Sequence, residues 1–200
     1  MARAAAQPSL FGAAPPGPEG FAYRPDLLSE QDERALAERL APLSFQPFDF
    51  HGHLAKRHVL GFGWRYDYGS RTVGRADPIP EFLLPLRAAI AAFAGVDAEA
   101  LAQVLINRYA PGAGVGWHRD KPAFEMVCAV SLLSACELQF RRRRDDGGFD
   151  RMRVAVEPRS AYRMSGPARH VWEHRVPEVQ HLRYSITFRT FAAGAGRDGA

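Results

Sequence analysis

The sequence has little cysteine, little lysine and no long hydrophobic run. Its two cysteines, Cys128 and Cys136, match no metal-binding or redox spacing, so we expect two reduced thiols packed in a core. No segment is long and apolar enough to span a bilayer. Gln7, Pro8 and Ser9 interrupt the N-terminal apolar residues, so the unbroken apolar stretch is shorter than a signal peptide needs. We therefore expect a soluble, cytoplasmic protein with no membrane partner, and we take it to be a monomer.

The positive charge comes almost entirely from arginine. The chain has 24 arginines and 2 lysines, a formal net charge of +4 and a pI near 9.4. This excess suits a polyanionic partner but is small for a nucleic-acid-binding domain. A GC-rich coding sequence explains the arginine bias as well as selection for bidentate contacts to phosphate or carboxylate does. Composition therefore favours nucleic acid only weakly.

The length and composition indicate one domain. A chain of 200 residues, 46% of them hydrophobic, is long enough for one well-packed core and short for two. Residues 1–20 and 192–200 are rich in small residues and carry no periodicity, so we expect both segments to be disordered. The folded domain is expected over residues 21–191.

Two helices and about eight strands are predicted. Ser29, followed by an acidic first turn, is typical of a helix start, and residues 81–94 form a second helix with Pro85 near its first turn and Gly95 as its C-terminal cap. A flexible loop is expected at 111–116, a hairpin tip at 145–148 and a further turn at 165–167. The expected strands cover residues 44–50, 57–68, 103–109, 126–133, 137–143, 151–156, 160–165 and 183–191. This pattern predicts an α+β protein whose sheet is a sandwich or double-stranded barrel.

The stretch G-W-H-R-D-K at 116–121 is a candidate half of a metal site. Alternation along an extended chain points His118 and Asp120 to the same side, with Arg119 turned away, so one cation could bridge them. The spacing is weakly specific, because the expected number of His-x-Asp triplets in a chain of this composition is about 0.4. A polar cluster at a strand end is the alternative.

Two other expected strands each carry a polar face. In residues 183–191 the polar side chains alternate with Tyr184, Ile186 and Phe188; the polar face holds Arg183, Ser185, Thr187 and Arg189. In an ordinary sandwich strand, the arginines would lie in solvent and the aromatics in the core. Asn107 and Tyr109 share a similar face. If the two faces line one cavity, they could hold a small dianion, with the guanidinium groups on its carboxylates.

The third metal ligand should come from far along the chain. The downstream candidates are His170, His174 and His181, whereas the upstream histidines are His51, His53 and His58. Two histidines and one carboxylate leave three positions open on iron, which suits Fe(II) chemistry with a bidentate cosubstrate and dioxygen. A zinc hydrolase could use the same ligands, but it has no need of a cradle for a dicarboxylate.

Four segments together resemble the AlkB family of Fe(II)- and 2-oxoglutarate-dependent dioxygenases, which are nucleic-acid dealkylases. The segments occur in the family's order and spacing, and the resemblance covers residues 21–191. They are N-R-Y-A-P-G (107–112), H-R-D-K (118–121), S-G-P-A-R with W-E-H (165–174) and R-Y-S-I-T-F-R (183–189). The resemblance implies a double-stranded β-helix, or jelly roll, supported by N-terminal helices.

The resemblance also assigns site residues. It makes His118, Asp120 and His174 the iron ligands and leaves His170 near the ligands or on the substrate side. It places Arg183 and Tyr109 on the far carboxylate of 2-oxoglutarate, and Arg189 and Asn107 near the carboxylate that chelates iron. Ser185, which lies where other members may carry Asn, is also assigned to the cosubstrate.

The implied cofactors are Fe(II), 2-oxoglutarate as cosubstrate and O2. The implied reaction oxidatively removes an alkyl group from a base of DNA or RNA and releases an aldehyde, succinate and CO2. An oxygenase of the same iron chemistry that acts on a protein or small molecule is the alternative. A binding module without catalysis is disfavoured, because all three ligands and both arginines are present.

The substrate side is less specific. Phe62, Trp64, Tyr66 and Tyr68 alternate onto one face of the expected strand, where they could stack an extruded base; Trp64 and Tyr66 are the preferred pair, and a buried aromatic stripe is the alternative. The arginines at 141–144 precede a hairpin tip, where they either meet phosphates or are simply solvated. Pro122 stands where some family members carry an acidic residue that reads the base, so the accepted lesion is open.

Overall fold

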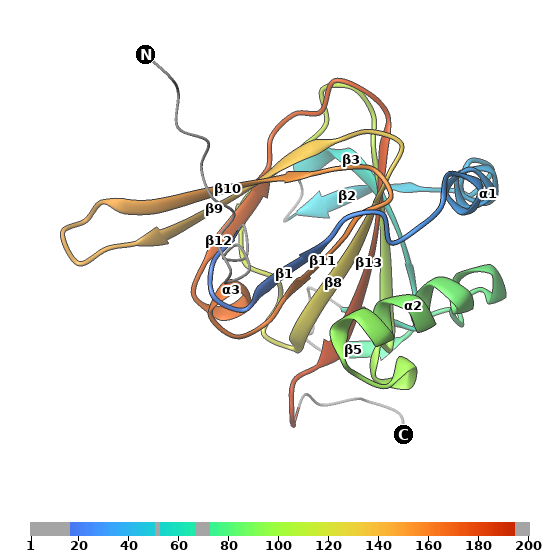
Figure 1. Ribbon diagram of the computed structural model, residues 1–200, viewed down its shortest axis with the longest axis horizontal. Coiled ribbons are helices and arrows are strands. Elements are labelled where there is room, and N and C mark those ends of the chain that lie inside the picture. The colour runs from blue at the N-terminus through green and yellow to red at the C-terminus, as the bar shows by residue number, and fades with distance from the viewer. Residues whose placement is uncertain (1–16, 51–52, 67–72, 195–200) are drawn as a thin grey trace, which may run out of the picture.

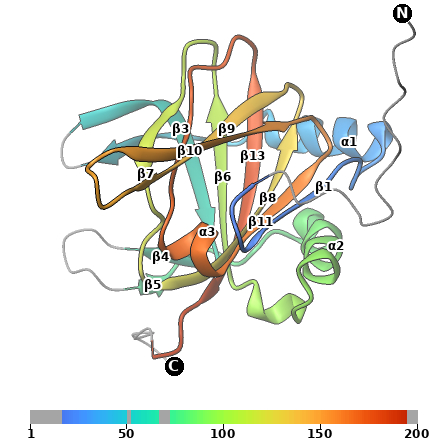
Figure 2. The ribbon, with the colours of Figure 1, turned by 60° about the vertical axis from the view of Figure 1, so that its left-hand side comes forward.

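The computed structural model describes residues 17–50, 53–66 and 73–194 (Figure 1). A seven-stranded sheet and a four-stranded sheet, both antiparallel, face each other (Figure 2). In spatial order, the large sheet contains β1 (Phe21–Arg24), β11 (Ala161–Met164), β8 (Phe124–Leu132), β13 (Arg183–Phe191), β6 (Gln103–Tyr109), β3 (His53–Phe62) and β2 (Gln46–Phe50). The small sheet contains β10 (Phe149–Val156), β9 (Cys136–Arg143), β12 (Glu173–Val176) and β7 (Val115–His118). The expected jelly roll is confirmed.

Two hydrophobic clusters cover the two faces of the large sheet. One lies between the sheets and joins residues such as Val127 of β8 to Phe140 of β9. The other lies under the helices, where Leu40 and Ile90 pack with Ile186 of β13. Strand β13 is therefore buried on both faces, so its polar face points between the sheets and not into solvent.

The two predicted helices form where their caps indicate. The Ser29 hydroxyl accepts a hydrogen bond from the Asp32 amide (3.1 Å), which starts α1 (Glu30–Leu40) with a capping box. A 3-10 turn, η1 (Glu81–Leu83), leads into α2 (Leu84–Ala94) with Pro85 in its first turn, and Gly95 ends α2 at φ 71°. Among the described residues, no helix is long and apolar enough to cross a membrane.

Three local predictions differ from the structure. The expected loop is present over residues 111–114, but β7 begins at Val115, and the expected turn at 165–167 begins α3 (Gly166–His170). The expected strand 57–68 is interrupted, because Gly63 has φ 78° and a Cβ there would collide with the Ala102 carbonyl oxygen. The chain therefore passes from β3 into a separate two-stranded sheet of β4 (Trp64–Tyr66) and β5 (Val73–Arg75). Strands β1, β5 and β12 were not predicted either.

The ends of the domain extend slightly past the predicted boundaries. The Phe21 amide donates to the Pro18 carbonyl (2.9 Å) and the Ser165 amide donates to the Gly20 carbonyl (3.0 Å), so residues 17–20 are an ordered turn. The Ala192 amide donates to the Ala123 carbonyl (2.9 Å). The disorder expected for residues 1–16 and 195–200 lies outside the described residues.

Candidate metal centre

Strands β7 and β12 bring the candidate metal ligands together. They are neighbours in the small sheet, and His118 lies directly opposite His174, with ring centroids 4.3 Å apart. Asp120 follows two residues after His118, and its Oδ2 lies 3.5 Å from His174 Nε2. One potential ligand atom from each of the three residues lies within 4.8 Å of the others. His170 lies apart on α3, where its Nε2 is 3.1 Å from Glu125 Oε1.

The three side chains have the protonation states that a metal requires. Burial lowers the pKa of His174 to about 3, and burial also lowers that of His118, so both imidazoles are neutral at neutral pH. Burial alone would raise the pKa of Asp120, but Arg189 and the two histidines outweigh this effect. The pKa of this carboxyl therefore lies well below its usual range, and the group is ionised at neutral pH. Two neutral imidazoles and one carboxylate are ready donors for a divalent cation.

Neighbouring groups fix the orientation of two of the candidate ligands. The Gly116 carbonyl oxygen lies 2.8 Å from Nδ1 of His118, which fits a proton on Nδ1 and leaves Nε2 as the ligand atom. Arg189 donates from Nε (3.1 Å) and Nη2 (2.9 Å) to Oδ1 of Asp120, and its Nη1 donates to Gln103 Oε1 (2.8 Å). Since Oδ1 is held by Arg189, Oδ2 faces the histidines.

Arg183 is a buried cation aimed between the sheets. Its side chain is 1% exposed, and the ring of Tyr109 lies 5.2 Å from its guanidinium carbon. Its Nε donates to the Ser131 hydroxyl (3.0 Å), whereas its Nη1 is buried without a hydrogen-bond partner. Within the described part of the chain, no carboxylate forms an ion pair with Arg183. A buried, unneutralised guanidinium fits an anionic ligand, and the far carboxylate of 2-oxoglutarate has the matching charge and fork geometry.

Strands β6 and β13 form the polar surface that the alternation predicts. In their antiparallel register, Tyr109 lies opposite Arg183 and Asn107 lies opposite Ser185, and all four side chains are buried. Opposite residues of paired strands share a face. The structure therefore brings the expected cosubstrate residues onto one surface, with Arg189 further along the same strand.

The comparisons with known proteins agree with this geometry. The family model described as the 2OG-Fe(II) oxygenase superfamily matches residues 20–189. The chain belongs to this superfamily. It is a 2-oxoglutarate-dependent dioxygenase, its cofactors are Fe(II), 2-oxoglutarate and O2, and its His-Asp-His triad fits iron binding.

The similar proteins are of the AlkB type. An alkylated DNA repair protein ALKBH8 homolog of Arabidopsis thaliana is 31% identical over 62% of this chain and 42% of that protein. The tRNA (carboxymethyluridine(34)-5-O)-methyltransferase ALKBH8 of Mus musculus is 28% identical over 80% of this chain and 24% of that protein. This oxygenase thus spans less than half the length of these relatives. The expected AlkB resemblance is confirmed.

Two solved structures share the fold. OsALKBH1 superposes with a TM-score of 0.63 at 19% identity, over 86% of this chain and 96% of that chain. A prolyl-4-hydroxylase of Pseudomonas putida superposes with a TM-score of 0.57 at 17% identity, over 86% of this chain and 93% of that chain. At these identities the likeness concerns the fold alone.

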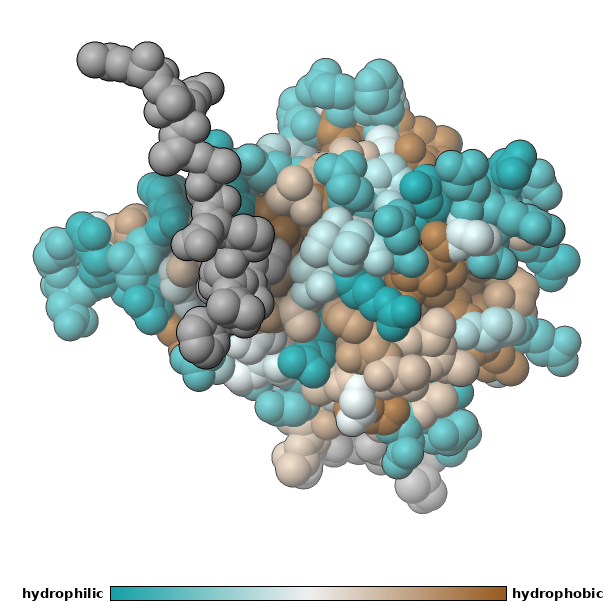
Figure 3. Space-filling view, in the orientation of Figure 1, coloured by the Kyte–Doolittle hydropathy of each residue, from teal (hydrophilic) through white to brown (hydrophobic). Residues whose placement is uncertain are grey.

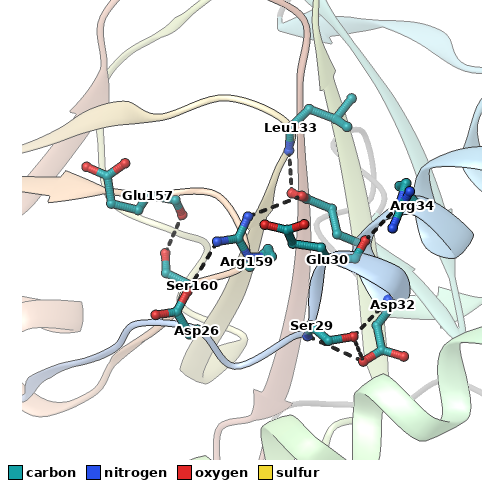
Figure 4. Close-up of polar contacts among 10 residues, drawn as sticks. Asp26, Ser29, Glu30, Asp32, Arg34, Leu133, Glu157, Arg159 and Ser160 are labelled. Atoms are coloured by element: carbon teal, nitrogen blue, oxygen red, sulfur yellow. Dashed lines mark hydrogen bonds and ion pairs between the residues drawn. The ribbon is translucent and has the colours of Figure 1, made fainter.

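A strained corner of the oxygenase holds Ser131, the partner of Arg183. The Ser131 carbonyl accepts from the Arg159 amide (2.8 Å), and its amide donates to the Ser160 carbonyl (3.0 Å). Glu33 of α1 accepts from the Leu133 amide (2.8 Å) and lies 3.8 Å from the Arg159 guanidinium. Figure 4 shows Leu133 and Arg159 at this corner. Leu133 and Arg159 have φ of 75° and 63°, a conformation that is costly for such residues and persists where its surroundings enforce it.

We predict that Ser131→Ala raises the 2-oxoglutarate requirement of the enzyme about tenfold, because it removes a hydrogen bond to a charged, buried donor. Succinate formation measured against 2-oxoglutarate concentration gives KM, which should rise more than kcat falls. Ser134→Ala is the matched control, since Ser134 lies in the next loop and its hydroxyl lies 3.5 Å from the His181 carbonyl. An unchanged KM in Ser131→Ala would show that Ser131 does not orient Arg183.

Arg169 ties the segment after Asp120 to α3. Its buried guanidinium donates from Nη2 to the carbonyls of Lys121 and Phe124, the latter at 2.7 Å. Both acceptors lie within four residues of Asp120 on the C-terminal side. Together with the contacts of Arg189, this arrangement holds the ligand loop on two sides.

The expected substrate residues lie in different surroundings. Trp64 is half-buried, and its ring packs edge-on against Phe191 (5.7 Å between centroids). The ring centroids of Phe191 and Phe124 are in turn 5.4 Å apart, and the guanidinium of Arg189 lies over the ring of Phe124. Phe62 belongs to the core under the helices, so the predicted single aromatic face is wrong. The side chain of Tyr66 lies outside the described residues, as does the whole of Tyr68.

Several residues of the site were not singled out by the sequence analysis. Gln103 carried a usable signal, because it shares the alternating face of Asn107 and Tyr109. Ser131 gave none, since its contact with Arg183 depends on the register between β8 and β13. Arg169 stands inside the quoted S-G-P-A-R segment, but its two carbonyl partners are fixed by tertiary packing alone.

Proposed function

We propose that this oxygenase oxidatively removes alkyl groups from nucleobases of DNA or RNA. Hydroxylation of the carbon attached to a base nitrogen would give an unstable hydroxyalkyl group. The carbon–nitrogen bond then breaks, the alkyl carbon leaves as an aldehyde, and the base nitrogen regains a proton. When bound, Fe(II), 2-oxoglutarate and O2 supply the oxidising chemistry, and 2-oxoglutarate leaves as succinate and CO2.

The similar proteins support a nucleic-acid substrate. One relative is called an alkylated DNA repair protein homolog, and the other is named for a modified uridine of tRNA. The names leave DNA and RNA both open for this chain. They favour a base over an amino-acid side chain as the group that is oxidised.

The structural observation that carries the proposal is the aromatic cluster beside the metal centre. Contacts run from Asp120 through Arg189 to Phe124, Phe191 and the half-buried Trp64. Arg75 of β5 lies over the ring of Trp64 at 5.5 Å. A partly exposed indole next to a cation, connected to a metal ligand by packed rings, suits stacking of an unpaired base.

The chain's own residues divide the remaining work. His118, Asp120 and His174 would hold the metal. Arg183 would bind the far carboxylate of the cosubstrate, and Arg189 keeps Asp120 ionised and oriented. No side chain needs to act as a nucleophile, so positioning is the protein's main contribution.

Mass spectrometry of defined oligonucleotides tests the proposal. Single-stranded DNA and RNA oligonucleotides with methyl or etheno lesions are incubated with the enzyme, Fe(II), ascorbate and 2-oxoglutarate. We expect at least one lesion to lose its alkyl mass, with one succinate formed for each base restored. Asp120→Ala serves as the inactive control.

Trp64 supplies a sharper control for the stacking role. Trp64→Ala should raise the KM for the oligonucleotide several-fold, whereas Trp64→Phe should keep most of the affinity because it retains an aromatic face. Succinate formation without oligonucleotide should be the same in both variants.

Succinate formation by the wild-type enzyme with no change in any oligonucleotide would instead favour a protein or small-molecule substrate for the same iron chemistry.

A further inference from the structure

The outer face of the small sheet is basic. In the antiparallel registers, Arg141 lies opposite Arg151 and Glu173, and Gln139 lies opposite Arg153 and Arg175. Because opposite residues of paired strands share a face, these side chains all point away from the metal centre. This outer face carries five arginines and two glutamates: Arg141, Arg143, Arg151, Arg153, Arg175, Glu137 and Glu173. The excess of three positive charges is most of the net charge of +4 on the whole chain.

An aromatic side chain lies among these arginines. The ring of Trp117 on β7 has the guanidinium carbon of Arg141 at 4.6 Å and that of Arg175 at 4.8 Å. Phe149 lies 4.8 Å from the same carbon of Arg141 and 5.5 Å from that of Arg151. Stacking holds flexible arginines in place, and an already ordered arginine loses less entropy when it binds a phosphate.

Hydrogen bonds on the sheet restrain two of these arginines further. The Nε of Arg141 donates to Glu173 (2.6 Å), and the Nε of Arg175 donates to Gln139 (2.7 Å). Arg143 and Arg151 are exposed, and the described part of the chain provides no ion pair for either. The face thus combines fixed guanidinium groups near β7 with available charge toward the hairpin of β9 and β10.

The outer face adjoins the metal centre through two strands. On β7, Trp117 points outward and the next residue, His118, points inward; on β12, Glu173 and Arg175 flank His174. Strand β7 is an edge of the small sheet, so a chain that leaves the metal centre over this edge reaches the outer face. The hairpin of β9 and β10 extends the face away from the body of the domain, and its projecting end is mostly hydrophilic (Figures 1 and 3).

We propose that this outer face binds the phosphates of a single-stranded nucleic acid on one side of the base that lies at the metal. The proposal rests on the proposed function for its substrate class. Fixed arginines interleaved with aromatics suit a single strand, because the guanidinium groups pair with phosphates and the rings stack with bases. The face therefore strengthens the binding of long substrates and does not take part in the chemical step.

Fluorescence anisotropy with labelled, unmodified RNA tests the face. The probes are oligonucleotides of about 20 and about 5 nucleotides, titrated at several salt concentrations. For Arg143→Glu with Arg151→Glu, we expect about tenfold weaker binding of the long probe and a salt slope shallower by roughly one to two. Binding of the short probe and turnover of short alkylated oligonucleotides should not change, because neither residue touches the metal centre.

The matched control is Arg24→Glu with Arg34→Glu. It makes the same charge change at exposed positions of β1 and α1, away from the outer face. Equal losses in the two double variants, or wild-type affinity of Arg143→Glu with Arg151→Glu for the long probe, would overturn the proposal. Selective loss without oxidation of any lesion would support the face and contradict the proposed function. Absence of binding by both probes would overturn the proposal for this face, whereas the proposed function is judged separately by oxidation of the lesions.

Discussion

Replacing His118 or Asp120 with alanine should reduce Fe(II)-dependent turnover of 2-oxoglutarate by more than about a hundredfold. Each change removes one of three donors, and the two that remain cannot hold the ion at the affinity that turnover needs. The donors are already deprotonated at neutral pH, as the lowered pKa values of His118, Asp120 and His174 indicate. Their loss therefore acts on metal binding directly. Succinate formation and Fe(II) binding under anaerobic conditions measure the two effects.

The control for this prediction lies between the two ligands. Arg119 is exposed and adjacent to both, so Arg119→Ala tests whether any change in this segment lowers activity. Its Fe(II) affinity should stay at the wild-type level. Full turnover by His118→Ala or Asp120→Ala would show that these residues do not bind the metal.

Arg183→Ala should raise the 2-oxoglutarate concentration needed for half-maximal turnover by at least about thirtyfold, with little change in Fe(II) affinity. The guanidinium is fully buried and has no anionic partner among the described residues, so its charge is available to the cosubstrate. Removing one partner of a buried charged pair generally costs about 2 to 5 kcal/mol. The measurement is succinate formation over a wide range of 2-oxoglutarate.

Thermal shift separates this loss of binding from misfolding. A ligand stabilises the state that binds it, so 2-oxoglutarate with Fe(II) should raise the Tm of the wild-type protein but barely that of Arg183→Ala. Arg183→Lys should give an intermediate shift, because it keeps the charge but loses the planar fork. Equal shifts for all three proteins would place the cosubstrate elsewhere.

Local signals in the sequence account for much of the fold. The capping box at Ser29 and the glycine cap at Gly95 fix both helices, because the orphan amides and carbonyls at helix ends are satisfied by nearby residues. The strands of the hairpin formed by β9 and β10 were also recognised, because the turn residues that join them are local in the sequence. Short strands such as β7 and β12 were missed, since four residues carry too little periodicity to stand out from a loop.

The site was predictable where alternation alone decides it, and not where tertiary packing does. The pattern of β13 separates Arg183 and Arg189 from Ile186, but both faces of the strand are buried, so hydrophobicity could not say which face lines the site. Resemblance to a known family supplied that step and also the choice of His174. Ser131 and Arg169 remained hidden, because their partners lie 52 and 45 residues away along the chain.

The two arginines around the loop that carries Asp120 would affect how a metal binds. Arg189 holds Asp120, and Arg169 holds the backbone just beyond it, so the loop is ordered by the protein itself. Metal capture would then require little further loss of chain entropy, because the candidate donors are already in place. A change in Arg169 should therefore appear as a looser, faster-exchanging loop in hydrogen exchange before it appears in the global stability of the fold.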